Sequence, residues 1–179
     1  MELVDRLRQG DPGAFDEVWE EFRARVFGYL ARMCGRRDLA EDLLQETFLR
    51  LAARARTLRE DSRLGPWLFT VARNLWVSHT RATLLDAERL DELALLDPGT
   101  AHSPFEAAAA SELGQRLERA LHRLAPAYRE ALLLVAVERM DAGDAAQVVG
   151  VSPEAFRQRL SRARGMIEDA LADGDRRTA

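Results

Sequence analysis

The sequence contains no lysine, because all 26 of its basic residues are arginine. The two residue types differ in donor geometry and hydration. Complete exclusion of one of them is nevertheless more typical of genome composition than of a particular function. There is also only one cysteine, Cys34, which excludes an intramolecular disulfide framework and is typical of a reducing cytoplasm. Its neighbours Met33 and Gly35 supply no activating charge, so we expect Cys34 to be a buried side chain that fills space and not a reactive thiol.

Long hydrophobic runs and enzyme signatures are missing as well. No apolar run approaches membrane-spanning length, and the N-terminus does not resemble a signal peptide. The three histidines, His79, His102 and His122, show no metal-ligand spacing with each other or with Cys34. P-loop, GxGxxG and nucleophile-elbow motifs are absent. We therefore expect a cytoplasmic protein that is not an enzyme, has no catalytic residue, needs no cofactor or metal and does not insert into membranes.

The net charge of −4 conceals an uneven distribution of charge along the chain. Residues 1–49 hold 11 acidic residues against 7 arginines, and residues 82–112 hold 7 acidic residues against 1 arginine. Between them, residues 50–81 hold 7 arginines against 2 acidic residues. Segregated charge creates local fields that the net value does not report. The negative net charge therefore does not argue against a nucleic-acid partner.

Apolar residues recur at three- and four-residue steps, and runs of alternating β-branched residues are absent, which predicts an all-α fold. Asp11-Pro12 starts a first helix, which Gly35 ends, and a second helix begins near Asp38. Thr57–Pro66 is polar and is expected to be a loop before a third helix. The apolar stripes of the three helices are Phe15, Trp19, Phe22, Val26 and Leu30; Leu39, Leu43, Leu44, Thr47, Phe48 and Leu51; and Trp67, Leu68, Val71, Ala72, Leu75 and Trp76. Three amphipathic helices imply a compact bundle.

The chain is expected to divide into two small helical domains joined by a flexible acidic linker. Residues 1–85 form the bundle, and residues 86–110 contain an acidic excess with Pro and Gly punctuation. Residues 111–172 regain helical periodicity, with Leu113, Leu117, Leu121 and Leu124 in one stripe, an interruption at Ala125-Pro126 and an apolar helix over Tyr128–Val137. Residues 173–179 form a polar tail, which we expect to be frayed.

The stretch from Asp141 to Ile167 has the pattern of a helix-turn-helix. Asp141 is a helix cap, Gly150 supplies a tight turn, and Ser152-Pro153 starts a second helix. Phe156, Leu160, Ala163 and Ile167 align on one face of that helix, and Glu154, Arg157, Gln158, Ser161, Arg162 and Arg164 lie on or beside the other. This division suits a recognition helix, with packing residues inside and hydrogen-bonding residues toward the major groove. An ordinary helical hairpin with a solvated basic face is the alternative.

Five segments together resemble the extracytoplasmic-function (ECF) branch of the sigma-70 family. GDPGAFDEVW is similar to the opening Gly-Asp-x-x-Ala-Phe signature of the family's region 2. DLAEDLLQETFLRL and PWLFTVARNLWVSHTR are similar to two further region 2 helices. LAPAYREALLL and VSPEAFRQRLSRAR resemble region 4. The resemblance implies an RNA polymerase sigma factor, in which residues 1–85 bind core polymerase and the −10 promoter element and residues 111–172 bind the −35 element.

The resemblance also implies a role for particular residues and partners. Docking on the polymerase β′ clamp would use Asp38, Glu41, Asp42, Gln45, Glu46 and Leu49. A base of the opened −10 element would be held by Arg59, Asp61, Ser62, Arg63, Trp67, Arg73, Asn74 and Arg81. The −35 element would be read by Ser152, Glu154, Arg157, Gln158, Arg159, Ser161, Arg162 and Arg164. The polymerase β flap and an anti-sigma factor are further expected partners. Trp67 and Trp76 share an apolar stripe, which favours a core position over base stacking.

Some positions depart from the family pattern, and two other functions remain open at this point. Ser78 stands where the family commonly has Asp, Gly143 replaces a bulkier residue, and Ala155-Phe156 replaces Thr-Val. These changes bear on promoter sequence and on the strength of DNA binding. A stand-alone helix-turn-helix regulator would explain residues 111–172 but not the acidic face of residues 38–51. A degenerate sigma relative that acts by protein contact alone is the other alternative.

Overall fold

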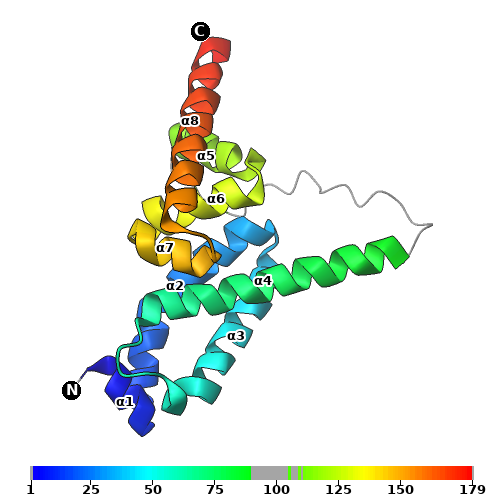
Figure 1. Cartoon of the computed structure of the whole chain (residues 1–179). Coiled ribbons are helices and arrows are strands. Elements are labelled where there is room, and N and C mark those ends of the chain that lie inside the picture. Colours follow the sequence, from blue (N-terminus) through cyan, green and yellow to red (C-terminus); the bar gives the residue numbers. More distant parts are fainter. Residues whose placement is uncertain (1, 90–104, 106–108, 110, 179) are drawn as a thin grey trace. The chain divides into compact units, whose positions relative to one another are not determined.

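The computed structural model describes the backbone of residues 2–89, 105, 109 and 111–178. Every regular element within these ranges is a helix (Figure 1), which confirms the predicted all-α class. The helices form two compact units, in agreement with the two expected domains. One unit contains Met1–Leu30 and Asp38–Leu95, and the other contains Ala31–Arg37 and Leu96–Ala179. Most of the linker predicted for residues 86–110 lies outside the described residues.

The first unit contains four α-helices and one 3-10 turn. They are α1 (Leu3–Gln9), α2 (Pro12–Cys34), α3 (Arg37–Arg54), η1 (Ala55–Thr57) and α4 (Leu64–Arg89). The end of α2 from Ala31 onward and the first residue of α3, Arg37, belong to the second unit. Helix α1 was not predicted, because its seven residues give too few turns for periodicity to stand out. Its buried Val4 and Leu7 anchor it to the unit. The predicted starts near Asp11 and Asp38 are confirmed.

The core of the first unit is built mainly from α2, α3 and α4. Val26 and Leu30 of the predicted α2 stripe are fully buried, and Tyr29 beside them packs edge to face on Phe69, with ring centroids 5.4 Å apart. Phe15 and Trp19 are only partly buried, but both rings contact Phe48 of α3. Further fully buried members are Ala14, Val18, Ala40, Thr47, Leu51, Leu68 and Ala72. The two tryptophans of α4 are half-buried at the edge of this core.

Helix α4 differs from the prediction at both ends. It begins at Leu64, so the expected loop Thr57–Pro66 is shorter than predicted. Pro66 lies in the first helical turn, where a missing N–H costs no intrahelical hydrogen bond. At its other end α4 continues to Arg89, four residues into the segment predicted as linker. The residues from 82 to 89 include no proline or glycine that would stop a helix.

The second unit contains α5 (Glu112–Arg123), α6 (Pro126–Leu132), the π-helical turn η2 (Leu133–Val137), α7 (Ala142–Val149) and α8 (Pro153–Thr178). The interruption at Ala125-Pro126 is confirmed. The apolar segment that follows changes from α to π geometry, a distinction that an uninterrupted apolar run does not encode. Phe156, Leu160 and Ala163 of α8 pack into the core of this unit.

Two expectations about this unit need correction. The segment 173–179 was predicted to be a frayed tail, whereas α8 continues through it to Thr178. The physical reason is that Gly174 weakens a helix but does not break it, and the segment contains no proline. In the predicted α5 stripe, Leu121 and Leu124 are buried, while Leu113 is 61% and Leu117 38% exposed. Among the described helices, none combines the length and hydropathy needed to cross a membrane.

Candidate polymerase and DNA interfaces

Helix α3 presents one charged face to solvent and buries the opposite face. Ala40, Leu43 and Leu51 are buried against the core of the first unit. The predicted polymerase-binding residues recur at three- and four-residue steps on the other side, and these are Asp38, Glu41, Asp42, Gln45, Glu46 and Leu49. Glu46 is half-buried and the other five are exposed. The structure therefore brings all six predicted residues together on one accessible stripe.

The two ends of this stripe differ in chemistry. Its first part is acidic, and there Glu46 Oε1 lies 2.9 Å from Nε of Arg50, one turn further along. The stripe ends on Leu49, three residues after Glu46, and this leucine is 64% exposed. An exposed leucine at the end of a carboxylate row combines electrostatic attraction with an apolar contact, a combination typical of protein interfaces.

The residues predicted to hold the −10 element lie along the loop before α4 and along α4 itself. Arg59 and Asp61 are exposed and bonded to each other, with Nε to Oδ1 at 3.0 Å and Nη2 to Oδ2 at 3.2 Å. Trp67, Asn74 and Arg81 are spaced by seven residues and therefore share one face of α4. The remaining candidates are Ser62 and Arg73, both half-buried, and Arg63, which is exposed. Arg73 lies about a quarter turn away from the face that carries Asn74.

Two further arginines, which were not among the predicted −10 residues, lie at the end of α3 and in η1. Arg54 and Arg56 are both exposed, and within the described residues neither has a carboxylate in salt-bridge distance. The guanidinium of Arg56 lies beside Gly10, where an added Cβ would come within 3.4 Å of Nη2. The arginine excess over residues 50–81 was the only sequence signal for these two side chains.

The helix-turn-helix forms as its capping residues predict. Asp141 Oδ1 accepts hydrogen bonds from the backbone N–H of Gly143 and of Asp144, both at 2.9 Å. Gly150 ends α7 with a φ of 75°, and Ser152 Oγ accepts from the N–H of Ala155 at 3.2 Å at the start of α8. Asp141 fixes the start of α7, whereas Gly150 and Ser152 fix the turn between α7 and α8. The two side-chain caps satisfy backbone donors that the helices leave open.

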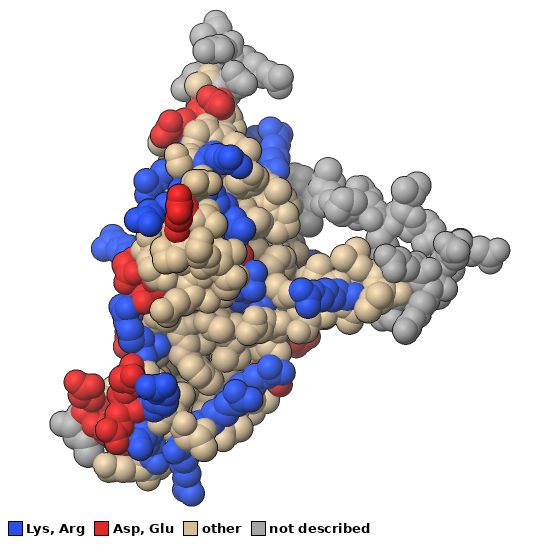
Figure 2. All heavy atoms as spheres, in the orientation of Figure 1, with Lys and Arg blue, Asp and Glu red and all other residues tan. Residues whose placement is uncertain are grey.

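Helix α8 separates its packing and polar residues as expected of a recognition helix. The candidates on its outer face are Ser152, Glu154, Arg157, Gln158, Ser161, Arg162 and Arg164, all exposed, together with the half-buried Arg159. Within the described part of the chain, none of these four arginines has a salt-bridge partner. Basic side chains gather around α8 in Figure 2. The arginines of the outer face are therefore free to donate to phosphates or base edges.

Arg129 supports the helix-turn-helix from within the second unit. Its side chain is buried, and the guanidinium donates to the carbonyl oxygens of Leu121 and Leu124, each at 3.0 Å, and also to that of His122. Burial lowers the pKa of this arginine below its usual value. Because these acceptors form the C-terminal end of α5, Arg129 holds α6 against that end. This role of Arg129 was not predictable from the sequence, since backbone acceptors leave no signature there.

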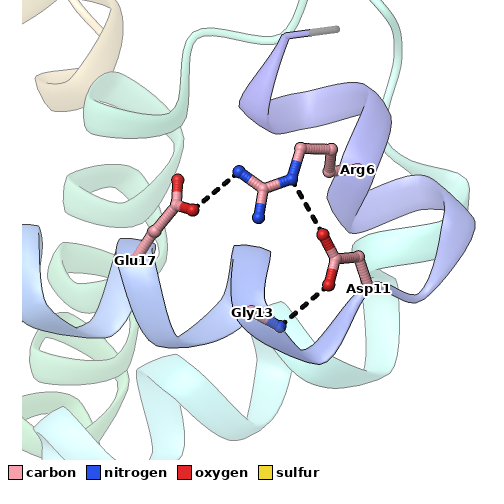
Figure 3. Close-up of polar contacts among 4 residues, drawn as sticks. All are labelled: Arg6, Asp11, Gly13 and Glu17. Carbon is pink, nitrogen blue, oxygen red and sulfur yellow. Dashed lines mark hydrogen bonds and ion pairs between the residues drawn. The ribbon is translucent and has the colours of Figure 1, made fainter.

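In the first unit, Arg6 joins α1 to α2 (Figure 3). Its Nε lies 2.8 Å from Oδ2 of Asp11, and its Nη1 lies 2.7 Å from Oε1 of Glu17. Hydrogen bonds to Glu17 and to Asp11 raise the pKa of Arg6, and the bond from Arg6 lowers the pKa of Asp11. Arg6 is thus engaged in holding the fold and is not available to a phosphate. Within the ranges that the structure describes, no group of three or more His, Cys, Asp or Glu side chains could hold a metal ion.

Two family models match the chain in the order that its architecture implies. Sigma-70 region 2 matches residues 18–83, and Sigma-70 region 4 matches residues 114–167. The chain is 33% identical to the RNA polymerase sigma factor CarQ of Myxococcus xanthus, over 95% of this chain and 96% of that protein. It is 32% identical to the ECF RNA polymerase sigma factor SigM of Bacillus subtilis, over 86% and 92%. The chain belongs to the sigma-70 family of RNA polymerase sigma factors, in its ECF branch.

Solved structures agree with this assignment. The sigma factor RpoE of Bartonella quintana, crystallised with the anti-sigma factor NepR, aligns with a TM-score of 0.74 and 25% identity, over 88% of this chain and 96% of that one. CnrH, in complex with the cytosolic domain of CnrY, shares the fold with a TM-score of 0.68 at 23% identity.

The family assignment settles the general function. As a sigma factor, the protein binds the RNA polymerase core and promoter DNA and directs transcription initiation. A stand-alone helix-turn-helix regulator is not supported, because the family match includes region 2 as well as region 4.

Proposed function

We propose that three exposed surfaces divide the work of this sigma factor. The stripe on α3 binds the β′ clamp of core polymerase, the loop before α4 and the Trp67 face of α4 hold the −10 element, and the outer face of α8 reads the −35 element. The observation that carries the proposal is that each surface lies on a helix whose opposite face is buried, with the loop before α4 extending the −10 surface. The polar side chains of these surfaces are consequently not needed for packing.

The α3 stripe is suited to a basic protein partner. Its carboxylates would speed and orient the encounter with a positively charged helix, an effect that salt screens. Leu49 would add a contact that persists at high salt, because its side chain is exposed in the free protein and would be covered in the complex. This pair of features favours a protein partner over DNA, which the carboxylates would repel.

The −10 surface combines positive charge with a short loop. Extraction of a base from the stack costs a few kcal/mol, which a close pocket and phosphate contacts offset. We propose that Arg54 and Arg56 add phosphate contacts to those of Arg59 and Arg63. Asp61 would be released from Arg59 when a nucleotide binds, because the pair is exposed and therefore weakly held.

The −35 surface combines base and backbone contacts on one helix. Arg157 and Gln158 occupy the first turns of α8, where recognition helices commonly reach base edges. Arg162 and Arg164 follow one turn later and suit phosphates beside the groove. In this scheme Ser152 caps α8 and stands near the DNA, while Glu154 restricts which bases fit.

The proposal also covers the boundaries of the modules along the chain and a regulatory partner. We propose residues 1–85 as the module for core and −10 binding, 86–110 as the linker, 111–172 as the module for −35 and β flap binding, and 173–179 as a terminal segment. Regulation by an anti-sigma factor is proposed because the similar RpoE of Bartonella quintana was crystallised with one. The protein would act without enzymatic activity of its own, in the cytoplasm where its polymerase works.

The test is reconstitution with core polymerase. We expect the purified chain to co-elute with core enzyme that lacks other sigma factors and to support run-off transcripts from the region upstream of its own gene. Transcripts with a defined start would support the proposal. Core binding without transcripts from any template would favour the alternative in which the protein acts by contact alone. Failure to bind core would overturn the proposal altogether.

A further inference from the structure

The turn that leads into the helix-turn-helix contains an unusual backbone conformation. Arg139 has a φ of 54°, and among the described residues it is the only non-glycine residue with a positive φ. Glycines occupy the other such positions, Gly10, Gly35 and Gly150. In the left-handed region a Cβ crowds the following carbonyl oxygen, and glycine avoids this cost. A glycine at position 139 would therefore form the same turn with less strain.

The arginine side chain does not repay that strain through contacts within the protein. It is exposed, and within the described part of the chain it makes no hydrogen bond, ion pair or ring contact. The turn itself is held by the backbone, since the N–H of Glu138 donates to Leu133 O at 2.9 Å and that of Met140 to Leu134 O at 3.0 Å. The guanidinium is thus dispensable for the fold. Strain that the fold does not need points to a function of the side chain.

The position of Arg139 suggests what that function is. It lies two residues before Asp141, the N-cap of α7, and α7 is the first helix of the helix-turn-helix. In such motifs the second helix enters the major groove, while the first crosses the sugar–phosphate backbone. A side chain at the entry to the first helix is placed beside that backbone. A guanidinium suits the position, because it pairs with two phosphate oxygens at once.

We infer that Arg139 is an additional DNA contact of this sigma factor, which holds a backbone phosphate next to the −35 element. The inference rests on the proposed −35 role of α8 and extends it to a residue outside the recognition helix. Since a phosphate carries no sequence information, Arg139 would strengthen binding at every promoter equally. The contact would also release counterions, so that its contribution falls as the salt concentration rises.

The test compares substitutions that separate charge from backbone strain. Arg139→Gly removes both, Arg139→Ala removes the charge alone, and Arg139→Lys keeps the charge. Holoenzyme reconstituted from core polymerase and each full-length variant is titrated onto a duplex that the wild-type holoenzyme transcribes, over a range of NaCl concentrations. The slope of log affinity against log salt is then compared. Arg23→Ala in α2, an exposed arginine paired with Glu20, controls for the change in net charge.

We expect the Gly and Ala variants to bind roughly three- to tenfold more weakly and to lose about one unit of the salt slope. The Lys variant and Arg23→Ala should stay close to wild type. The melting temperature of Arg139→Gly should be unchanged or raised by up to about 5 °C, because relief of strain outweighs the added freedom of the unfolded chain.

Two results would overturn the inference. One is wild-type affinity and salt slope in both the Gly and the Ala variants; the other is a clearly lower melting temperature for Arg139→Gly, which would assign the side chain to the fold. Arg157→Ala, measured in parallel, tests the proposed −35 role of α8 separately from the role of Arg139. If Arg157→Ala also binds like wild type, the proposed −35 role of α8 fails. If Arg157→Ala loses affinity while the Arg139 variants do not, the −35 role of α8 stands and only the proposed contact of Arg139 is excluded.

Discussion

Nε of Arg6 lies 2.8 Å from one carboxylate oxygen of Asp11, while the other oxygen accepts the backbone N–H of Gly13 at 2.9 Å. The same carboxylate therefore links α1 to α2 through its ion pair with Arg6 and caps the start of α2. This double use explains why an aspartate suits the position. Asparagine would keep the cap, whereas it would lose the charge that pairs with the arginine.

We expect Asp11→Asn to lower the melting temperature of the full chain and Asp11→Ala to lower it further, since only the latter also removes the cap. The effect should depend on pH. Arg6 holds the pKa of Asp11 below its ordinary value of 3.8, so the unfolded chain binds more protons than the folded one in this range. The stability from Asp11 is therefore fully present above the unfolded pKa and is lost as pH falls through the folded pKa.

Thermal unfolding followed by circular dichroism at pH 7 and at successively lower pH values tests this prediction. The gap in melting temperature between wild type and Asp11→Asn should be constant near neutrality and narrow below about pH 4. Asp16→Asn, an exposed neighbour on α2, serves as the matched control. A gap that stays unchanged down to the lowest pH would show that the ion pair contributes nothing.

The double substitution Asp42→Arg with Glu46→Arg should abolish binding to core polymerase while leaving helicity intact. Both residues lie on the solvent side of α3, and the reversed charges would repel a basic partner. Glu46 also loses its pair with Arg50, but an exposed i,i+4 pair contributes only about 0.3–0.5 kcal/mol. Core affinity is measured by fluorescence anisotropy of a labelled chain.

A charge reversal elsewhere on the first unit controls for the change in net charge. Glu20→Arg with Glu21→Arg alters two exposed carboxylates of α2 and should leave core affinity close to wild type. If the α3 variant binds core polymerase as tightly as the α2 variant and the wild type do, the α3 stripe is solvated surface and not a docking site.

Arg157→Ala and Arg162→Ala should each weaken binding to the −35 element, by about 1–3 kcal/mol where a bidentate base contact is lost. The two variants are expected to differ in kind. Loss of a base contact relaxes the preference at one position of the element, whereas loss of a phosphate contact weakens all sequences alike. Competition between a promoter duplex and its single-base variants distinguishes these cases. Unchanged transcription in both variants would remove α8 from promoter recognition.

Sequence patterns predicted the features that depend on neighbours along the chain. Asp11, Asp141 and Ser152 cap helices as expected, and Gly150 adopts the predicted left-handed turn, because capping is set within three residues. The exposed stripe of α3 was likewise predictable, since the period of a helix fixes which residues share a face.

Features that depend on distant or backbone partners could not be predicted. The Arg59–Asp61 pair requires a particular loop conformation, and the conformation of Arg139 follows from a π-helical turn that an apolar run does not reveal. Arg6 meets Glu17 only because α1 folds back beside α2, and α1 itself was not predicted. Tertiary packing decides each of these contacts.

Arg129→Met should destabilise the second unit by about 2–4 kcal/mol, because the buried carbonyls of Leu121 and Leu124 would lose their donor while the aliphatic volume is largely kept. Arg129→Lys should recover only part of this loss, since a single ammonium group cannot reach all the carbonyl oxygens to which the wider guanidinium donates. Urea unfolding of the full chain, with unfolding of the second unit followed by hydrogen exchange in α5 and α6, measures the effect. Arg119→Met is the matched control, because that side chain is exposed and its Nε donates to the carbonyl oxygen of Gln115 at 3.3 Å. If both methionine variants unfold at the wild-type urea concentration, the α5 end is held by other contacts and Arg129 is not its anchor.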